Sequence, residues 1–368
     1  SHEFKRMKTG SRLLTLVVVI ALLVLYTLAW IGRTEFKKKK SIGKKPISSL
    51  NLSNGLPLPH ISTTVARQIE NNEERGNRDL AIGMATGVHE LNLAVFVKSL
   101  REFSSCDIVL FVGNTTQRVD EFMKVYNVTA IKLNLDELEP PKIRQYHPSS
   151  YRWILKSKFL NTTRRRYHRI LMADIRDTAF QSNPFDIVQD PGLYVFAEGV
   201  NFADEGWNEK WVAQCFGDAL ARSLRGKPVI CSGISIGTSA AVSHYLATMS
   251  ATLTAPDFQA CESNGVDQGL HNVLVHTSRL PSARVLSDAD GPVAHMQNTL
   301  MLTHGEPPGP VTVHSPTHGR PAAIVHQYDR RPPLQAYLFS RYLHWDSYPS
   351  SPGAAACRGY RLAPGLDL

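Results

Sequence analysis

Cysteine is scarce in this 368-residue chain, and no two cysteines are spaced as Cys-x-x-Cys. The five are Cys106, Cys215, Cys231, Cys261 and Cys357. Because zinc sites usually show such closely spaced ligands, the sequence predicts no zinc site. In an oxidising compartment one or two disulfides are expected, with Cys215 and Cys231 as the first pair, and buried free thiols are an equally ordinary outcome.

A surplus of positive charge is also missing from most of the chain. The formal net charge is +9, but residues 1–45 hold eleven Lys and Arg against two Glu, which accounts for all of it. The remaining chain carries thirty basic and thirty acidic residues. Nucleic-acid binding needs a basic face, so we expect no nucleic-acid partner.

Charge is absent altogether from residues 13–31, an apolar run close to the ~20 residues of a spanning helix. We expect a single-pass membrane anchor there, after a cytosolic tail at 1–12 and before a Lys-, Ser- and Pro-rich stem at 32–75. A cleaved signal peptide is the alternative, although its apolar core is usually shorter, about 7–15 residues. Counting positive charges favours a cytosolic main part, whereas four Asn-x-Ser/Thr sequons, at Asn51, Asn114, Asn127 and Asn161, favour a lumenal one, which we adopt.

No internal repeat is present, and from Leu80 onward short apolar runs alternate with helical patterns. Strands are expected at 80–85, 107–112, 130–133, 170–173, 192–197, 228–230 and 322–325. Helices are expected at 90–103, 118–126, 149–161, 207–224, 239–253 and 334–342, with irregular chain after 267. The βαβαβ beginning predicts a parallel sheet with helices on its faces.

One of these apolar runs ends in two carboxylates, Asp174 and Asp177, on either side of Arg176. A buried parallel strand delivers such groups to its carboxyl end, where open α/β sheets bind ligands. Two Asp side chains there could hold a divalent cation that neutralises a diphosphate, and an Arg suits phosphate oxygens. A turn, a helix N-cap or a self-contained ion-pair network is the alternative.

Four other places combine reactive side chains with a suitable position, and each has a structural alternative. Ser232 and Gly233 follow a predicted strand, where glycine lets the backbone approach a ligand or simply forms a turn. Asp267 and Gln268 could contact a sugar, unless Asp267 only caps a helix. His326 follows an apolar strand, where a lone histidine is often structural. Arg152 could reach a diphosphate or form an ion pair.

Together with the tail, anchor and stem, these motifs resemble type II Golgi glycosyltransferases of the GT-A fold, glycogenin-like members of the nucleotide-diphospho-sugar transferase superfamily. The resemblance covers about residues 78–345. It implies a Rossmann-like, mostly parallel α/β sheet with flanking helices in one catalytic domain at 76–345, followed by a C-terminal tail at 346–368. It also implies a Golgi or ER membrane location with the catalytic domain in the lumen.

The resemblance further implies roles for individual residues. Asp174, Asp177 and His326 would hold Mn²⁺ or Mg²⁺, although the family pattern is Asp-x-Asp and this chain has Asp-x-x-Asp. Asp267, Gln268 and Arg176 would be catalytic. The implied donor-binding residues are Gly83, Thr86, Arg152, Asp174, Ser232 and Gly233. The expected reaction moves a sugar from a nucleotide sugar, a UDP-sugar first, to a glycan or glycoprotein acceptor, with retention of configuration favoured.

Three other classes of protein compete with this interpretation. A haloacid dehalogenase-type phosphatase needs Asp-x-Asp-x-Thr/Val, and Arg176 occupies its second acidic position. A sulfotransferase needs a basic loop after the first strand, and residues 83–87 contain no base. A non-catalytic lumenal protein that binds glycans or nucleotide sugars stays open, and the Asp-x-x-Asp spacing is the feature that favours it.

Overall fold

The computed structural model describes residues 78–343, except 290, 299–301, 306–308 and 316. The predicted tail, anchor and stem, and the C-terminal tail, lie outside these residues. Among the helices of the described ranges, none is both long and apolar enough to cross a membrane.

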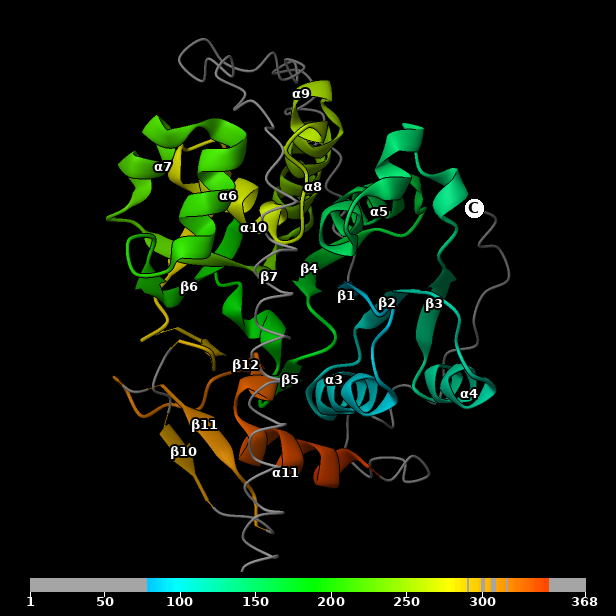
Figure 1. The fold of residues 1–368 in the computed structure, drawn as a ribbon. Helices are drawn as coiled ribbons and strands as arrows, with labels where there is room; N and C mark the ends of the chain where they lie inside the picture. The colour runs from blue at the N-terminus through cyan, green and yellow to red at the C-terminus, as the bar shows by residue number, and fades with distance from the viewer. Residues whose placement is uncertain (1–77, 290, 299–301, 306–308, 316, 344–368) are drawn as a thin grey trace, which may run out of the picture. The chain divides into compact units, whose positions relative to one another are not determined.

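A seven-stranded sheet forms the centre of the described region, in the order β3-β2-β1-β4-β7-β6-β8 (Figure 1). Only β7 runs antiparallel to its neighbours, so the predicted mostly parallel sheet is confirmed. The strands are β1 (Arg78–Met84), β2 (Asp107–Val112), β3 (Val128–Lys132), β4 (Tyr167–Ala173), β6 (Leu193–Asn201), β7 (Pro228–Thr238) and β8 (Ala283–Leu286).

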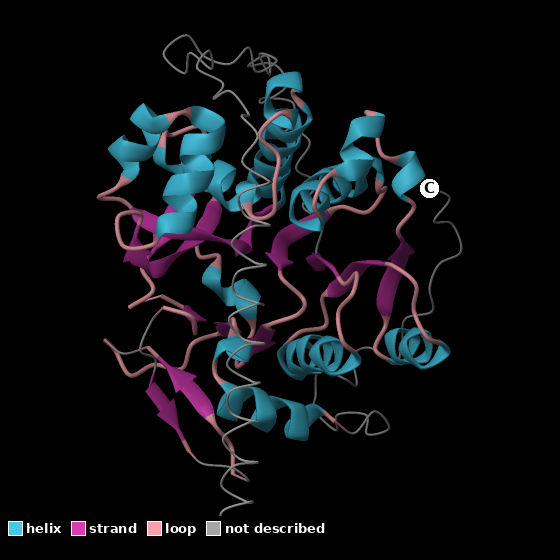
Figure 2. Ribbon diagram, in the orientation of Figure 1, coloured by secondary structure: helices cyan, strands magenta, loops and turns pink. Residues whose placement is uncertain are grey.

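Helices cover both faces of this sheet (Figure 2). One face packs against α3 (Glu90–Phe103) and α4 (Gln117–Val125). The other packs against α5 (Pro148–Thr162), α6 (Gly206–Phe216), α7 (Asp218–Leu224), α8 (Ser239–Thr254), α9 (Pro256–Gln259) and α10 (Val266–His276). Short 3₁₀ helices lie at Leu135–Glu137, Pro141–Gln145, Pro184–Ile187 and Tyr328–Arg330.

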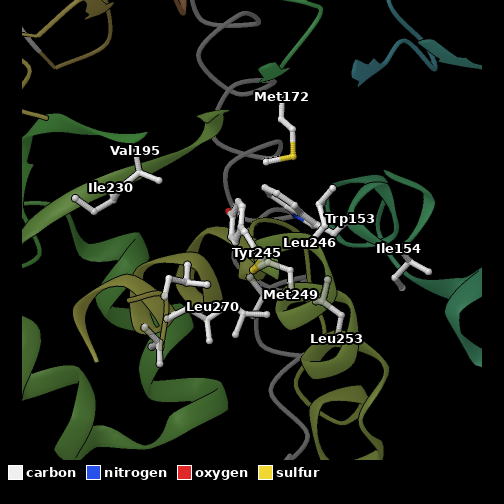
Figure 3. Close-up of a cluster of buried hydrophobic side chains, with 14 of the residues drawn as sticks. Trp153, Ile154, Met172, Val195, Ile230, Tyr245, Leu246, Met249, Leu253 and Leu270 are labelled. Atoms are coloured by element: carbon white, nitrogen blue, oxygen red, sulfur yellow. The ribbon is translucent and has the colours of Figure 1, made fainter. Parts of the chain in front are cut away.

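Alternating side chains of the buried strands explain the two-faced packing. In β4, Ile170 and Met172 join the core under α5 and α8, whereas Leu171 packs on the side of α3. At the centre of the first core, Trp153 of α5 and Tyr245 of α8 meet edge to face, with ring centroids 5.3 Å apart (Figure 3). These packed layers fix the position of the residues that follow β4.

A smaller sheet begins immediately after Asp177. It contains β5 (Thr178–Phe180), β12 (Ile324–His326) and β9 (Val293–His295), with β12 in the middle. A two-stranded sheet of β10 (Leu302–His304) and β11 (Thr312–His314), and the last helix α11 (Pro332–Tyr342), lie on the same side. The acidic segment 174–177 therefore connects the large sheet to the small one.

The strand order changes direction between β1 and β4. From β1 the chain proceeds outward to β2 and β3, and then returns to the other side of β1 to form β4. In doubly wound sheets, ligands bind outside the carboxyl ends of the strands at this kind of switch point. Asp174 follows β4 directly and is therefore located there.

The structure corrects several expected elements. The single helix predicted at 207–224 is wrong, because Gly217, with φ of 89°, separates α6 from α7. The strand predicted at 228–230 continues to Thr238, so the small residues after Cys231 belong to β7 and not to a loop. The chain after residue 267 is not irregular at first, since it forms α10. His326 is the last residue of β12 and does not follow the strand.

The expected pairing of Cys215 with Cys231 is wrong, whereas the expectations of one or two disulfides and of buried free thiols are confirmed. Cys215 is bonded to Cys261, and Cys231 is a buried free thiol, as is Cys106. Cys215 lies in α6 and Cys261 just after α9, so the bond joins neighbouring helices, whereas Cys231 is inside the central sheet.

Candidate active site and metal centre

Asp174, Asp177 and His326 converge at the junction of the two sheets. One ligand atom from each lies within 4.8 Å of the other two, so these three residues, called the Asp174 group below, could hold a metal ion. The His326 Nε2 atom is 3.6 Å from the Asp177 Oδ1 atom, and both side chains are buried. Neither of these two atoms has a hydrogen-bond partner within the described residues. Two buried polar atoms that face one another without partners fit a cation between them.

Gly233 of β7 provides the space for this group. A Cβ atom at this position would lie 2.8 Å from the His326 Nε2 atom and 2.9 Å from Asp174 Oδ2. Its carbonyl accepts a 2.8 Å hydrogen bond from the Asp174 backbone amide, which holds the carboxylate beside it. Only a residue without a side chain allows the two ligands to approach each other here.

The electrostatics of Asp177 fit a cation as well. Burial raises its pKa, the nearby His326 opposes the rise, and the charge of Asp174 adds to it. A cation between these groups would favour the ionised carboxylates and offset the cost of burying them.

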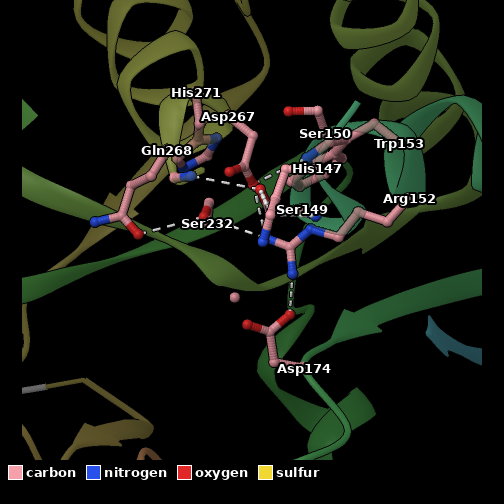
Figure 4. Close-up of polar contacts among 12 residues, drawn as sticks. His147, Ser149, Ser150, Arg152, Trp153, Asp174, Ser232, Asp267, Gln268 and His271 are labelled. Atoms are coloured by element: carbon pink, nitrogen blue, oxygen red, sulfur yellow. Dashed lines mark hydrogen bonds and ion pairs between the residues drawn. The ribbon is translucent and has the colours of Figure 1, made fainter. Parts of the chain in front are cut away.

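A second polar centre lies beside the first, around Arg152 of α5 (Figure 4). The Arg152 guanidinium is paired with Asp174 and, through Nη2, with Asp267 Oδ2 at 2.8 Å. Asp267 also accepts a 3.2 Å hydrogen bond from Trp153 Nε1 and is buried. Gly265, not Asp267, is the N-cap of α10, so the capping interpretation of Asp267 is wrong.

A chain of hydrogen bonds leads from this centre across the sheet. Arg152 Nη2 donates to Ser232 Oγ at 3.4 Å, and that hydroxyl donates to Gln268 Oε1 at 3.3 Å. Gln268 Nε2 donates to Glu198 Oε1 at 3.3 Å. Burial raises the pKa of Glu198 to about 7. This series of hydrogen bonds therefore includes the half-buried amide of Gln268 and the carboxyl group of Glu198, which changes charge near neutral pH.

Arg176 lies at the outer edge of the Asp174 group. Its Nη2 atom is 3.4 Å from Asp177 Oδ2 and 3.6 Å from Asp329 Oδ2, and 57 % of its side chain is exposed. Its carbonyl accepts a 3.0 Å hydrogen bond from Tyr328, which fixes the backbone. The guanidinium is thus positioned to meet an anion that arrives from solvent.

Two predicted donor-binding residues are not part of these centres. A Cβ on Gly83 would meet the Ile175 side chain and, at 2.8 Å, the Ala173 carbonyl, so this glycine permits close packing of β1 against the segment after β4. Thr86 is half-buried after β1 and interacts with the Tyr151 hydroxyl. Neither Gly83 nor Thr86 contacts the side chains of the Asp174 group.

Sequence reasoning missed one residue of this region, His295. In β9 it is the register partner of His326 in β12, and the two Nδ1 atoms are 3.1 Å apart. Cys231 Sγ lies 3.5 Å from His326 Nδ1, which gives a second buried group that could hold a metal ion. The signal was a pattern that occurs twice, Val293-Ala294-His295 and Ile324-Val325-His326, in which two apolar residues precede a histidine.

Comparisons with known proteins find no protein-family model and no curated protein that matches this chain. The site combines a carboxylate and imidazole group that could hold a cation, a buried Arg–Asp centre and an exposed arginine beside them.

Proposed function

We propose that the chain is a glycosyltransferase of the GT-A type, which moves a sugar from a nucleotide sugar, a UDP-sugar first, to a glycan or glycoprotein acceptor. The observation that supports it most is the convergence of Asp174, Asp177 and His326 at the switch point of the sheet, beside Asp267 and Gln268. Residues far apart in the sequence meet where a nucleotide-binding α/β sheet holds its ligand.

Mn²⁺ or Mg²⁺ suits the two carboxylates of the Asp174 group, and the imidazole favours Mn²⁺, the less hard of the two ions. When bound, the cation would supply positive charge next to the two donor phosphates. Arg176, which is largely exposed at the edge of the group, would contact the same diphosphate and stabilise it as it leaves. The charge of Arg176, added to that of the cation, would compensate for the departure from the Asp-x-Asp spacing.

The residues around Arg152 would orient the sugar. The Asp267 carboxylate is already engaged by Arg152 and Trp153, so we assign it a positioning role. Gln268 and Ser232 present an amide and a hydroxyl between that centre and Glu198, and these groups would bind sugar hydroxyls. The resemblance favours retention of configuration, which the anomeric form of the first product, followed by NMR, would test.

The second candidate is a binding protein without turnover. The pairing of Arg152 with Asp174 favours it, because the guanidinium competes with a cation for that carboxylate. Such a protein would bind a nucleotide sugar and release it unchanged.

Hydrolysis of a panel of UDP- and GDP-sugars by the full chain separates the two functions. We expect one donor to be cleaved with Mn²⁺ and not with a chelator, and Asp177→Asn to abolish the cleavage. Asp329→Asn is the matched control, because Asp329 also faces Arg176 but does not belong to the Asp174 group. Metal-dependent binding without cleavage of any donor would favour the binding protein, and a folded chain that neither binds nor cleaves would refute both.

A further inference from the structure

Cys231, His295 and His326 come from three different strands and meet in the interior. The parallel pairing of β9 with β12 places the two histidines directly side by side. Cys231 of β7 reaches the same point, and all three side chains are buried, with His295 fully so. One ligand atom of each lies within 4.8 Å of the other two.

The two separations that involve His326 are close to those of ligands around one tetrahedral ion. With metal–nitrogen bonds of about 2.0–2.1 Å and a metal–sulfur bond of about 2.3 Å, neighbouring nitrogens lie about 3.3 Å apart, and sulfur and nitrogen about 3.6 Å apart. The observed values are 3.1 Å between the two Nδ1 atoms and 3.5 Å between Cys231 Sγ and His326 Nδ1. Both values are within about 0.2 Å of this geometry.

The hydrogen-bonding capacity of the three groups is poorly matched without a cation. Two imidazole Nδ1 atoms can share one proton, and a thiol is a weak donor and a weak acceptor. The His295 Nε2 atom, which would keep the ring proton if Nδ1 bound a metal, has no partner among the described residues.

We propose that Cys231, His295 and His326 form a second metal site, which binds a thiophilic divalent ion such as Zn²⁺. A thiolate and two imidazoles are the ligand types that zinc prefers, in contrast to the carboxylates of Asp174 and Asp177. Glu198 interacts with the Cys231 thiol and therefore lies next to this group. The site was not expected from the sequence because its ligands are not closely spaced along the chain.

His326 belongs to both metal groups through different nitrogens. Its Nδ1 atom faces Cys231 and His295, and its Nε2 atom faces Asp177. A neutral imidazole has one lone pair, so the ring serves one metal at a time. Zn²⁺ in the second site is therefore expected to weaken Mn²⁺ binding to the Asp174 group.

Cobalt substitution in the full chain tests the second site. After removal of metals with a chelator, Co²⁺ is titrated while the thiolate-to-cobalt charge-transfer band in the near ultraviolet is recorded. We expect the band to reach its maximum at one equivalent, to be lost in Cys231→Ser, and to need at least about tenfold more Co²⁺ in His295→Asn. Cys106→Ser, which removes the other buried free thiol, should keep the band.

No charge-transfer band in the folded wild-type chain would overturn the proposal, as would a band that survives in both Cys231→Ser and His295→Asn. Unchanged Mn²⁺ affinity after loading with Zn²⁺ would contradict the sharing of His326. The experiment uses metals alone and no nucleotide sugar, so its failure is distinguishable from failure of the proposed transferase function.

Discussion

At the scale of single residues, the strand-end pattern of Asp174 and Asp177 was sufficient to predict where the two carboxylates lie, because a buried strand must end before charged side chains begin. The partners of these residues could not be predicted. Arg152 is 115 residues from Asp267, and the contact depends on how α5 and α10 pack. A single sequence contains the residue types but not that packing.

Gly233 offers the sharpest substitution at this scale. In Gly233→Ala the new Cβ would crowd His326 and Asp174, so we expect Mn²⁺ affinity to fall by at least about tenfold. Gly226→Ala is the matched control, because no atom lies within 4 Å of a Cβ there. Calorimetric titration with Mn²⁺ measures both, and equal affinities would show that Gly233 is not part of the site.

The buried side chain of Lys156 should make the free energy of unfolding depend on pH. Burial, with the charge of Arg152 adding to it, lowers the pKa of Lys156 to about 7, from an ordinary value of 10.5 in the unfolded chain. Between these values the unfolded chain binds more protons, so the free energy of unfolding should rise with pH, by at most about 1.4 kcal/mol per pH unit.

Urea denaturation at pH 7.5 and 9 measures this effect in the wild type and in Lys156→Met. The variant retains a side chain of similar length without the charge, so its stability should lack this part of the rise and should exceed that of the wild type at the lower pH. The same pH dependence in both proteins would contradict the assignment.

At the scale of elements, periodicity predicted the helices and strands that pack one face against the core, and it failed where small residues are present. The run from Cys231 to Gly237 looked like a loop, yet it is the second half of β7. Gly237 stays in the strand because its neighbour in the sheet is close: a Cβ there would lie 3.1 Å from the Leu193 Cα. Glycine thus marked a close approach of strands and not a turn.

The disulfide between Cys215 and Cys261 is expected to stabilise the contact between two elements of the fold. It closes a sequence separation of 46 residues between α6 and the segment after α9. Loop entropy gives about 4 kcal/mol for a loop of that length. The Cys215→Ser/Cys261→Ser double variant should lose this much in denaturant unfolding, and Cys106→Ser should lose much less. Equal transition midpoints for the double variant and the wild type would refute a stabilising role.

At the scale of the whole molecule, the position of the sequons tests the lumenal location. Asn114 and Asn161 are exposed, whereas Asn127 is half-buried with φ of 51°. In eukaryotic cells we expect glycans at Asn114 and Asn161, detected as a mobility shift that an endoglycosidase removes. The Asn114→Gln/Asn161→Gln variant should lose most of the shift. A wild-type chain without glycans would instead support the cytosolic orientation that the positive charges favour.

The central claim is that the Asp174 group binds a cation that in turn binds a nucleoside diphosphate. Calorimetric titration of the full chain with UDP, in Mn²⁺ and in chelator, tests it most directly. We expect binding with Mn²⁺ that weakens by about 100-fold in chelator, or in Asp177→Asn with Mn²⁺ present, and that stays near wild type in Asp329→Asn. Equal UDP affinity with and without metal, or in wild type and Asp177→Asn, would contradict the claim.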